Sequence, residues 1–232
     1  TTTPWTLPSN TGLCVNPDLD YAKVKAADGY TYVMACSLLD KVLSPLAKDG
    51  EAAYEILETY KGTDLVGIDY EPLYACAAEA AAKQHKRAHF VIADGYVTAD
   101  DGTGIVHIAP AFGEDDARVG RENGFPLIKF VDEKGVMTEE TPFAGMRCKP
   151  TEKEMAAGAI SADPEVLKDL SARKLLFDAP KFTHSYPHCW RCDTPLIYYA
   201  RESWFIKMSA VKDDLVRNNN TVNWFPATIG TG

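Results

Sequence analysis

The sequence predicts a mixed α/β protein with a β-barrel-like core of short strands, flanking helices and a C-terminal strand-rich extension. Short runs of β-branched and aromatic residues dominate the first half of the chain. Turns containing glycine separate these runs, for example at Asp28-Gly29 and Lys61-Gly62. Helical segments are fewer and lie between the strands. With 232 residues, the chain is long enough to bury a core.

The predicted strands are short, and several of them alternate apolar and polar residues. A further pair of strands, 127–131 and 136–138, flanks Asp132-Glu133-Lys134-Gly135, which is typical of a hairpin turn. The five other predicted strands are 21–26, 30–35, 54–60, 88–97 and 104–108.

Four helices are predicted, and two of them have clear boundaries. One helix follows Gly113, begins with three acidic residues and ends before Gly124. Another begins behind Asp163, which is followed by proline at the first helical position. The predicted helices are 37–48, 72–86, 114–123 and 164–174.

Composition and patterning predict three parts: a core domain over 1–160, a helical connection over 161–178 and the extension over 179–232. Aromatic and cationic residues become more frequent in the extension. The first residue is threonine and a motif begins at once, so we expect the chain to be a piece of a longer protein.

Bulk properties narrow the functional classes. The chain is 46% hydrophobic and 25% charged, as in ordinary globular proteins, and no apolar run has the length of a membrane span. The net charge of −9 argues against broad, nonspecific binding to nucleic acid, although local contact with an RNA end is compatible with it. Six cysteines without a disulfide-like spacing favour a reducing compartment, and we expect a cytoplasmic location.

Two motifs carry chemistry. The first, TTTPWTLPSN, places hydroxyls and an amide within ten residues, and on residue types alone it fits an edge strand and turn. The second, GTGIVHIAPAFGEDD, places His107 nine residues before Asp116. A buried histidine satisfied by the backbone, and an acid at a helix start, are the simplest readings. Together, however, these groups could hold an ammonium and orient an ester for attack by water.

Both motifs resemble the editing domain of isoleucyl-tRNA synthetases, the insert called the first connective polypeptide. The segments SYPHCWRCDTPLIYYARESWFIKMS and VNWFPATI resemble the region where that insert returns to the catalytic domain, so the likeness spans nearly the whole chain. The sister valyl and leucyl domains carry an Arg-Pro-acid-Thr type motif in place of TTTPWT and lack the histidine. The resemblance implies hydrolysis of mischarged valyl-tRNA(Ile) with isoleucyl-tRNA(Ile) spared, within a parent that ligates isoleucine to tRNA using ATP.

The resemblance also implies roles for individual residues. Asp116 would anchor the α-ammonium group, and His107 would form the floor that limits side-chain size. A Gly-His pair in many bacterial relatives is replaced here by Ala111-Phe112, which looks like the eukaryotic-type branch and leaves His107 without a second histidine. The implied catalytic residues are Thr2, Thr3 and Asp116, and the implied substrate-binding residues are Thr1, Thr6, Asn10 and His107.

Cofactors and partners follow from the same resemblance. Editing would need no cofactor, and the partners would be the tRNA(Ile) 3′ end carrying valine and the parent's catalytic domain, with no membrane. Cys189 and Cys192, preceded by His184 and His188, look like half of a zinc site that the parent would complete. A reduced thiol pair at a turn explains the two cysteines equally well.

Two alternatives remain open at this stage. The chain could be a non-catalytic module that binds tRNA or protein with the same fold, or a zinc-ribbon scaffold around Cys189 and Cys192. The presence of the threonines, His107 and Asp116 favours the hydrolase over the binding module. The absence of a second CxxC pair from the sequence weighs against the zinc ribbon.

Overall fold

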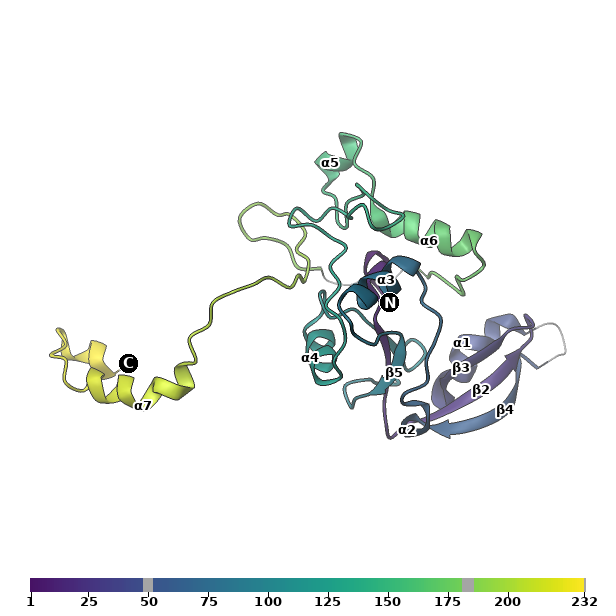
Figure 1. Ribbon diagram of the computed structural model, residues 1–232, viewed down its shortest axis with the longest axis horizontal. Coiled ribbons are helices and arrows are strands. Elements are labelled where there is room, and N and C mark those ends of the chain that lie inside the picture. Colours follow the sequence, from purple (N-terminus) through teal and green to yellow (C-terminus); the bar gives the residue numbers. More distant parts are fainter. Residues whose placement is uncertain (48–51, 181–185, 232) are drawn as a thin grey trace. The chain divides into compact units, whose positions relative to one another are not determined.

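The structure is a computed structural model that describes residues 1–47, 52–180 and 186–231. The chain forms two compact units, Thr1–Tyr199 and Ala200–Gly232. The first unit contains two three-stranded sheets and most of the helices (Figure 1). The mixed α/β class predicted from the sequence is therefore confirmed. The boundary between the units lies inside the predicted extension.

The first sheet carries the two sequence motifs. Its central strand β1, Gly12–Val15, pairs in parallel with β5, Phe90–Ala93, and antiparallel with β6, Ile105–Ile108. Within this register, Leu13 lies opposite His107. Helix α4, Glu114–Glu122, supplies Val119 to the core beneath the sheet. The end of the TTTPWTLPSN segment is thereby fixed next to the strand that carries His107.

The second sheet is antiparallel, in the order β3, β2, β4. The strands are Thr31–Ala35, Asp20–Ala26 and Tyr54–Lys61. Helix α1, Leu39–Leu43, lies beside this sheet (Figure 1). Its Leu39 and Leu43 are buried in one cluster with Val24 of β2 and Met34 of β3. β4 is an edge strand, and both of its faces are largely exposed. The strand predictions for this sheet are confirmed to within one residue at most ends.

The two sheets stay separate and do not close into a barrel. A closed barrel needs one continuous hydrogen-bonded ladder that returns to its first strand, whereas the described residues form two separate sheets of three strands each. The two sheets are joined through a shared cluster in which Val15 of β1 packs with Tyr21 of β2 and Ala35 of β3. The barrel-like prediction is corrected to two open sheets that share part of their core.

The helices follow the predictions with shifted ends. Helix α4 matches its prediction because its acidic first turn and Gly124 define it. The predicted helix 37–48 is a short α1 between two 3₁₀ turns, and residue 48 lies outside the described residues. The remaining helical elements of the first unit are η1 Pro4–Ser9, η2 Cys36–Leu38, η3 Ser44–Leu46, α2 Gly62–Leu65, α3 Ala75–Lys83, α5 Glu152–Ala156 and α6 Ala162–Ala172.

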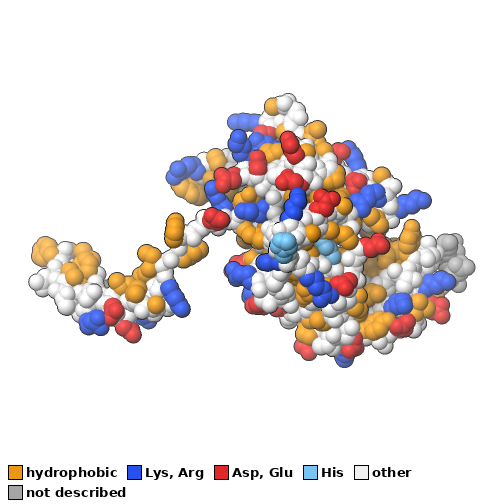
Figure 2. Space-filling view, in the orientation of Figure 1, with side chains coloured by type: hydrophobic (Ala, Val, Ile, Leu, Met, Phe, Trp, Pro, Cys, Tyr) orange, Lys and Arg blue, Asp and Glu red, His pale blue; other side chains and the backbone are white. Residues whose placement is uncertain are grey.

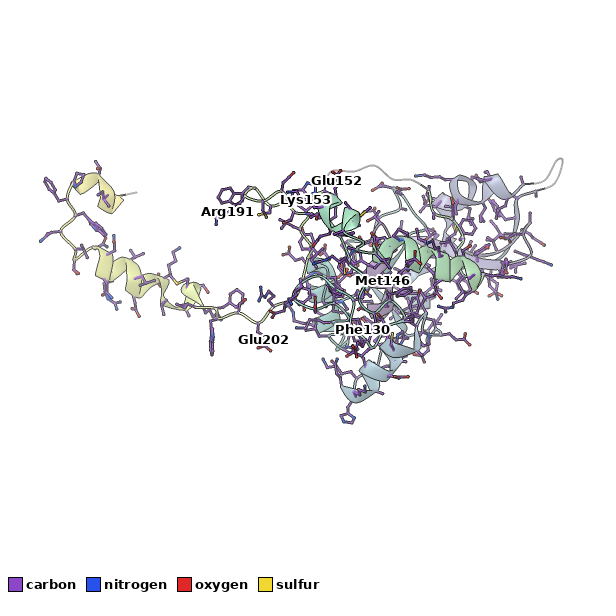
Figure 3. The ribbon with its side chains drawn as sticks, turned by 90° about the horizontal axis from the view of Figure 1, so that it is seen from above. Phe130, Met146, Glu152, Lys153, Arg191 and Glu202 are labelled. Atoms are coloured by element: carbon purple, nitrogen blue, oxygen red, sulfur yellow. The ribbon has the colours of Figure 1, made fainter. Side chains whose placement is uncertain are left out.

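The predicted hairpin is reduced to isolated bridges. The turn is present, because the Gly135 amide donates to the Asp132 carbonyl at 3.1 Å. Its arms form single bridges, Val131 with Met137 and Val136 with Arg147, rather than strands. Phe130 before the turn is buried among the packed side chains, whereas Glu152 and Lys153 project from α5 at the surface (Figure 3).

The C-terminal unit differs from the strand-rich prediction. Its described residues form helix α7, Met208–Asn219, and the turn η4, Ala227–Thr231, and none of them pairs in a sheet. Trp204, Phe205 and Ile206 are residue types with high strand propensity, but a strand also needs a partner ladder. These apolar side chains are exposed, and Figure 2 shows many hydrophobic side chains on this unit. Every helix described is too short and too polar for a bilayer span.

Helix α6 holds the threonine segment in place. Asp163 in its first turn accepts a hydrogen bond from the Trp5 amide at 2.9 Å and from the Lys149 ammonium at 2.5 Å. All three side chains are largely buried, and Trp5 also packs edge-on against Phe112 at 5.0 Å between ring centroids. The helix begins at Ala162 with Ser161 as its N-cap residue, two residues before the predicted start. Asp163 therefore anchors η1 across the fold.

Replacing Asp163 should loosen this anchor. We expect Asp163→Ala to lower the free energy of unfolding by about 2 kcal/mol, because it leaves a buried amide and a buried ammonium unpartnered. Urea unfolding measures the change. Glu165→Ala on the same helix removes a more exposed ion pair with Lys168 and should cost less than about 0.5 kcal/mol. Equal effects of the two substitutions would contradict the anchoring role.

Candidate functional site

The threonine segment precedes and begins the 3₁₀ turn η1. Pro4 occupies the first turn position, and its fixed φ favours that start. The Thr3 amide donates to the Thr1 hydroxyl at 3.0 Å. Thr1 and Thr2 are exposed and Thr3 is half-buried. Among the described residues, the hydroxyls of Thr2 and Thr3 have no hydrogen-bond partner and are free to contact a ligand.

His107 lies in β6 between two residues of the first motif. Its Nε2 is 3.0 Å from the Thr6 hydroxyl, and its Nδ1 is 2.9 Å from the Asn10 amide nitrogen. The Thr6 hydroxyl also lies 2.8 Å from the Thr3 carbonyl, to which it donates. Three of the residues that the sequence analysis selected, Thr6, Asn10 and His107, thus meet in one hydrogen-bonded group.

The directions of these hydrogen bonds fix the histidine tautomer. A hydroxyl has one proton, and Thr6 gives its proton to the Thr3 carbonyl, so Thr6 accepts from His107 Nε2–H. The Asn10 amide donates one proton to the Gly12 carbonyl at 2.9 Å and the other to His107 Nδ1. The neutral imidazole therefore carries its proton on Nε2, and both ring nitrogens are engaged. His107 in this state has no free lone pair with which to act as a general base.

Burial keeps this imidazole neutral. Removal from water, chiefly, lowers the pKa of His107 from its ordinary value of 6.5 to about 3. A neutral ring matches a wall of a pocket that receives an ammonium group, because an imidazolium would repel it. The geometry supports the role of a wall over that of a base.

Asp116 lies in the first turn of α4 and reaches back to the end of β6. Its Oδ2 accepts from the Ala109 amide at 2.9 Å, two residues beyond His107. Burial raises the pKa of Asp116 above its ordinary value. No lysine or arginine among the described residues forms an ion pair with it. The neighbouring Asp115 is exposed and faces Arg118 instead.

A cavity of about 280 Å³ lies beside these groups. Thr1 and His107 line it, together with Tyr96 and the loop Gly102–Gly104, whose two glycines have positive φ. The space is small, as a pocket for a short aliphatic side chain should be. A larger open hollow, of about 640 Å³, lies near Asp132 and Glu139, away from both motifs.

Several residues near the site carried no signal in the sequence. The Tyr70 hydroxyl donates to Asn10 Oδ1 at 2.6 Å, and His89 Nε2 lies 3.1 Å from the Asn10 carbonyl. The Tyr96 hydroxyl is buried and has no partner among the described residues besides the weakly accepting Cys14 thiol. Isolated aromatic residues in loops form no motif, so pattern reading missed them. Phe112, which stands where the resemblance placed a second histidine in other relatives, is buried and packs against Trp5.

The predicted zinc half-site forms a tight turn. The Asp193 amide donates to the Cys189 carbonyl at 2.8 Å, and the Cys189 amide donates to Thr194 at 2.9 Å. The Thr194 hydroxyl, 3.1 Å from Cys192 Sγ, lowers the pKa of that thiol. In the part of the chain that the structure describes, no three metal-binding side chains cluster. His184 lies outside that part, so the turn offers two thiols of the four ligands zinc needs.

Comparison with known proteins shows which proteins the chain is similar to. The isoleucine–tRNA ligase of Clostridium novyi (strain NT) is 43% identical over the whole chain. Those of Clostridium tetani (strain Massachusetts / E88) and Bacillus thuringiensis (strain Al Hakam) are 44% and 43% identical, over 100% and 97% of it. The chain is homologous to one segment of the isoleucine–tRNA ligases. It spans about a fifth of the length of these relatives, 20% in each case.

Two further comparisons were with protein-family profiles and with solved structures. No protein-family profile matches the chain. The solved structure described as the crystal structure of GlLeuRS-CP1 superposes with a TM-score of 0.40 and 20% sequence identity, over 53% of this chain and 41% of that one. The relatives named above are bacterial, and the eukaryotic-type branch suggested by Ala111-Phe112 stays a prediction.

The half-buried histidine makes stability depend on pH. The unfolded His107 binds a proton below pH 6.5, whereas the folded one does so only near pH 3. The unfolded state therefore gains protons first as pH falls, and the free energy of unfolding decreases across this window. We expect His107→Gln, which cannot titrate, to lose less stability than the parent chain between neutral and mildly acidic pH. Urea unfolding at several pH values measures this.

The control for this experiment is His85→Asn, at an exposed position with positive φ that asparagine tolerates. This variant should keep the pH dependence of the parent chain. If His107→Gln and the parent chain lose stability in parallel, the imidazole is not held neutral by the fold.

Proposed function

We propose that this chain is a post-transfer editing domain that hydrolyses the ester of valyl-tRNA(Ile) and spares isoleucyl-tRNA(Ile). The observation that carries the proposal is Asp116, a half-buried carboxylate without a cationic partner among the described residues. It lies at the end of the strand whose His107 lines the small cavity. Homology to isoleucine–tRNA ligases supplies the class of substrate, an aminoacyl-tRNA.

The discrimination problem explains the need for such a site. Isoleucine exceeds valine by one methylene, and one methylene in a hydrophobic enzyme pocket is worth only about 1 to 3 kcal/mol. One binding step therefore rejects valine only by roughly 10-fold to 200-fold. A second pocket too small for isoleucine reverses the preference, because steric exclusion of a larger side chain is far stronger than the loss of a contact. The ring of His107 is the wall that sets this size limit.

Asp116 anchors the α-ammonium group of the bound amino acid. A carboxylate held in a poorly hydrated place gains a short, charge-assisted contact when an ammonium arrives. The amide of Ala109 orients the carboxylate and leaves its second oxygen available for this contact. The amino acid is then fixed at one end, and the ester points toward the threonine segment.

Hydrolysis proceeds by attack of water on the ester carbonyl. A bond forms between the water oxygen and the carbonyl carbon, and the bond to the ribose oxygen of the terminal adenosine breaks. The proton lost by water ends on the leaving ribose oxygen. Thr2 and Thr3, whose hydroxyls are free, position the water and stabilise the developing oxyanion. His107 takes no proton, and a neighbouring ribose hydroxyl of the substrate relays it.

The rest of the proposal concerns the longer protein. The homologous ligases imply that the parent joins isoleucine to tRNA using ATP and works in the cytoplasm, with tRNA(Ile) and the catalytic domain as partners of this chain. Cys189 and Cys192 would supply two thiolates to a zinc ion that other parts of the parent complete. Editing itself needs no metal in this proposal.

Removing the charge of Asp116 should affect catalysis and stability in opposite directions. We expect Asp116→Asn to reduce kcat/KM for valyl-tRNA(Ile) on the order of 100-fold, the equivalent of one charge-assisted contact. The pKa of Asp116 is raised, so its ionised form costs stability at neutral pH, and this cost disappears as pH falls below the folded pKa. Asp116→Asn should therefore melt a few degrees higher at neutral pH, with the gain shrinking in acid.

The control is Asp115→Asn, which alters the exposed neighbour. We expect its deacylation rate to stay within about twofold of the parent chain and its melting temperature to change little. Full activity of Asp116→Asn would contradict the ammonium assignment. Loss of activity in both variants would point to a general effect of charge rather than to an anchor.

Removing the wall should remove the size limit. In His107→Ala, space opens beside the cavity, and we expect the ratio of valyl- to isoleucyl-tRNA(Ile) deacylation rates to fall by at least about tenfold. The ratio is the correct measure, because Thr6 and Asn10 lose a partner and both rates also fall. An unchanged ratio would show that another group excludes isoleucine.

A further inference from the structure

We propose that Tyr70 is a positioning residue that keeps His107 in the tautomer protonated on Nε2 by holding the side chain of Asn10. This inference rests on the proposed function for its effect on hydrolysis, whereas its structural content stands on the described contacts alone. Tyr70 belongs to neither sequence motif and lies in the loop before α3. It does not line the cavity beside His107, so it acts through Asn10.

The Tyr70 hydroxyl supplies what the Asn10 side chain otherwise lacks. Asn10 is buried, and its two amide protons go to the Gly12 carbonyl and His107 Nδ1. Its Oδ1 then needs a donor, and the Tyr70 hydroxyl lies 2.6 Å away. Without that donor, Oδ1 would be a buried acceptor without a partner, and such groups are rarely left unsatisfied. The tyrosine completes the hydrogen bonding of Asn10.

His89 holds the same residue from its backbone side. It is buried, its Nε2 donates to the Asn10 carbonyl at 3.1 Å, and its backbone amide donates to the Thr11 carbonyl at 2.6 Å. Its φ of 61° is one that residues other than glycine rarely adopt. Unusual backbone conformations persist where the surroundings enforce them, and they concentrate at functional sites. Asn10 is therefore fixed at both its carbonyl and its side chain.

Tyr70 and His89 also hold each other. The Tyr70 amide donates to the His89 carbonyl at 2.9 Å, and the two rings meet edge to face with centroids 5.7 Å apart. This pair sits behind Asn10 as a second layer, remote in sequence from both motifs. A directed chain of hydrogen bonds results, from Tyr70 through Asn10, His107 and Thr6 to the Thr3 carbonyl.

The polarity of this chain has a chemical consequence. Reversing one bond of the chain requires reversing its neighbours. The Asn10 amide nitrogen also lies 2.9 Å from the Gly12 carbonyl and 3.4 Å from the Ile108 carbonyl, so a turn of this side chain would break these contacts as well as the bond from Tyr70. If the Asn10 side chain were free to turn, its carbonyl oxygen could face Nδ1 and stabilise the other tautomer, protonated on Nδ1. His107 Nε2 would then accept from Thr6, and the Thr3 carbonyl would lose the Thr6 hydroxyl and keep only the Thr6 amide, at 3.1 Å. The Tyr70 hydroxyl opposes that turn of the Asn10 side chain. It thereby keeps the hydrogen bonds that join His107 to Thr6 and Thr6 to Thr3.

The test compares the parent chain with Tyr70→Phe, which removes only the hydroxyl. Long-range ¹H–¹⁵N NMR of histidine-labelled protein at neutral pH reports which ring nitrogen is protonated, and the His107 signals are identified by their absence in His107→Gln. We expect one tautomer, protonated on Nε2, in the parent chain and a mixture of tautomers in Tyr70→Phe. Deacylation of valyl-tRNA(Ile) should show kcat lowered about fivefold to tenfold, with KM within about twofold.

The matched control is Tyr74→Phe, which deletes a hydroxyl that donates to Asp169 at 2.9 Å and touches no residue of the chain of hydrogen bonds. It should keep the single tautomer and the parent kinetics. A merely structural role for Tyr70 would lower the melting temperature of both variants without changing the tautomer.

Each outcome decides a separate claim. A single Nε2–H tautomer in Tyr70→Phe, or a mixture already in the parent chain, would overturn the positioning role. A changed tautomer with unchanged kcat would overturn its part in hydrolysis. If the parent chain deacylates no aminoacyl-tRNA, the proposed function fails, and the NMR comparison alone still decides whether Tyr70 holds His107.

Discussion

The hydrogen-bonded group formed by Thr6, His107 and Asn10 is the constraint on which the site depends. It joins η1 to β6, segments about a hundred residues apart, and gives the imidazole one tautomer. Because both ring nitrogens are engaged and burial keeps the ring neutral, His107 contributes shape rather than proton transfer. In the proposed reaction, the chemistry is therefore left to water, the substrate and the free hydroxyls, and selectivity to a rigid wall.

Strand β1 and helix α6 hold that hydrogen-bonded group in place. Strand β1 places Asn10 and Gly12 beside β6, and the close packing of Gly12 against the Phe125 ring leaves no space for a Cβ there. Asp163 of α6, 158 residues away in the sequence, holds Trp5. The segment is thus fixed by strand pairing on one side and a charged hydrogen bond on the other. A site that discriminates by size needs such rigidity, because a wall that yields admits the larger side chain.

Most strands and helices could be predicted from the sequence, but the contacts between them could not. Strands β2, β3 and β6 and helix α4 were predictable because their propensity, caps and glycines agree locally. Strand β1 was missed, because four residues without alternation form a central strand only through partners distant in sequence. The threonines, His107 and Asp116 were selected by resemblance, whereas the tautomer and the roles of Tyr70, His89 and Asp163 follow only from three-dimensional contacts. The aromatic residues near the C-terminus suggested strands that no ladder completes.

The most direct test of the central claim is the rate at which this chain deacylates valyl-tRNA(Ile) and isoleucyl-tRNA(Ile), measured side by side at saturating tRNA. A small cavity walled by a fixed neutral imidazole predicts rapid release of valine and retention of isoleucine. Equal rates for the two substrates, or release of neither amino acid, would contradict the account.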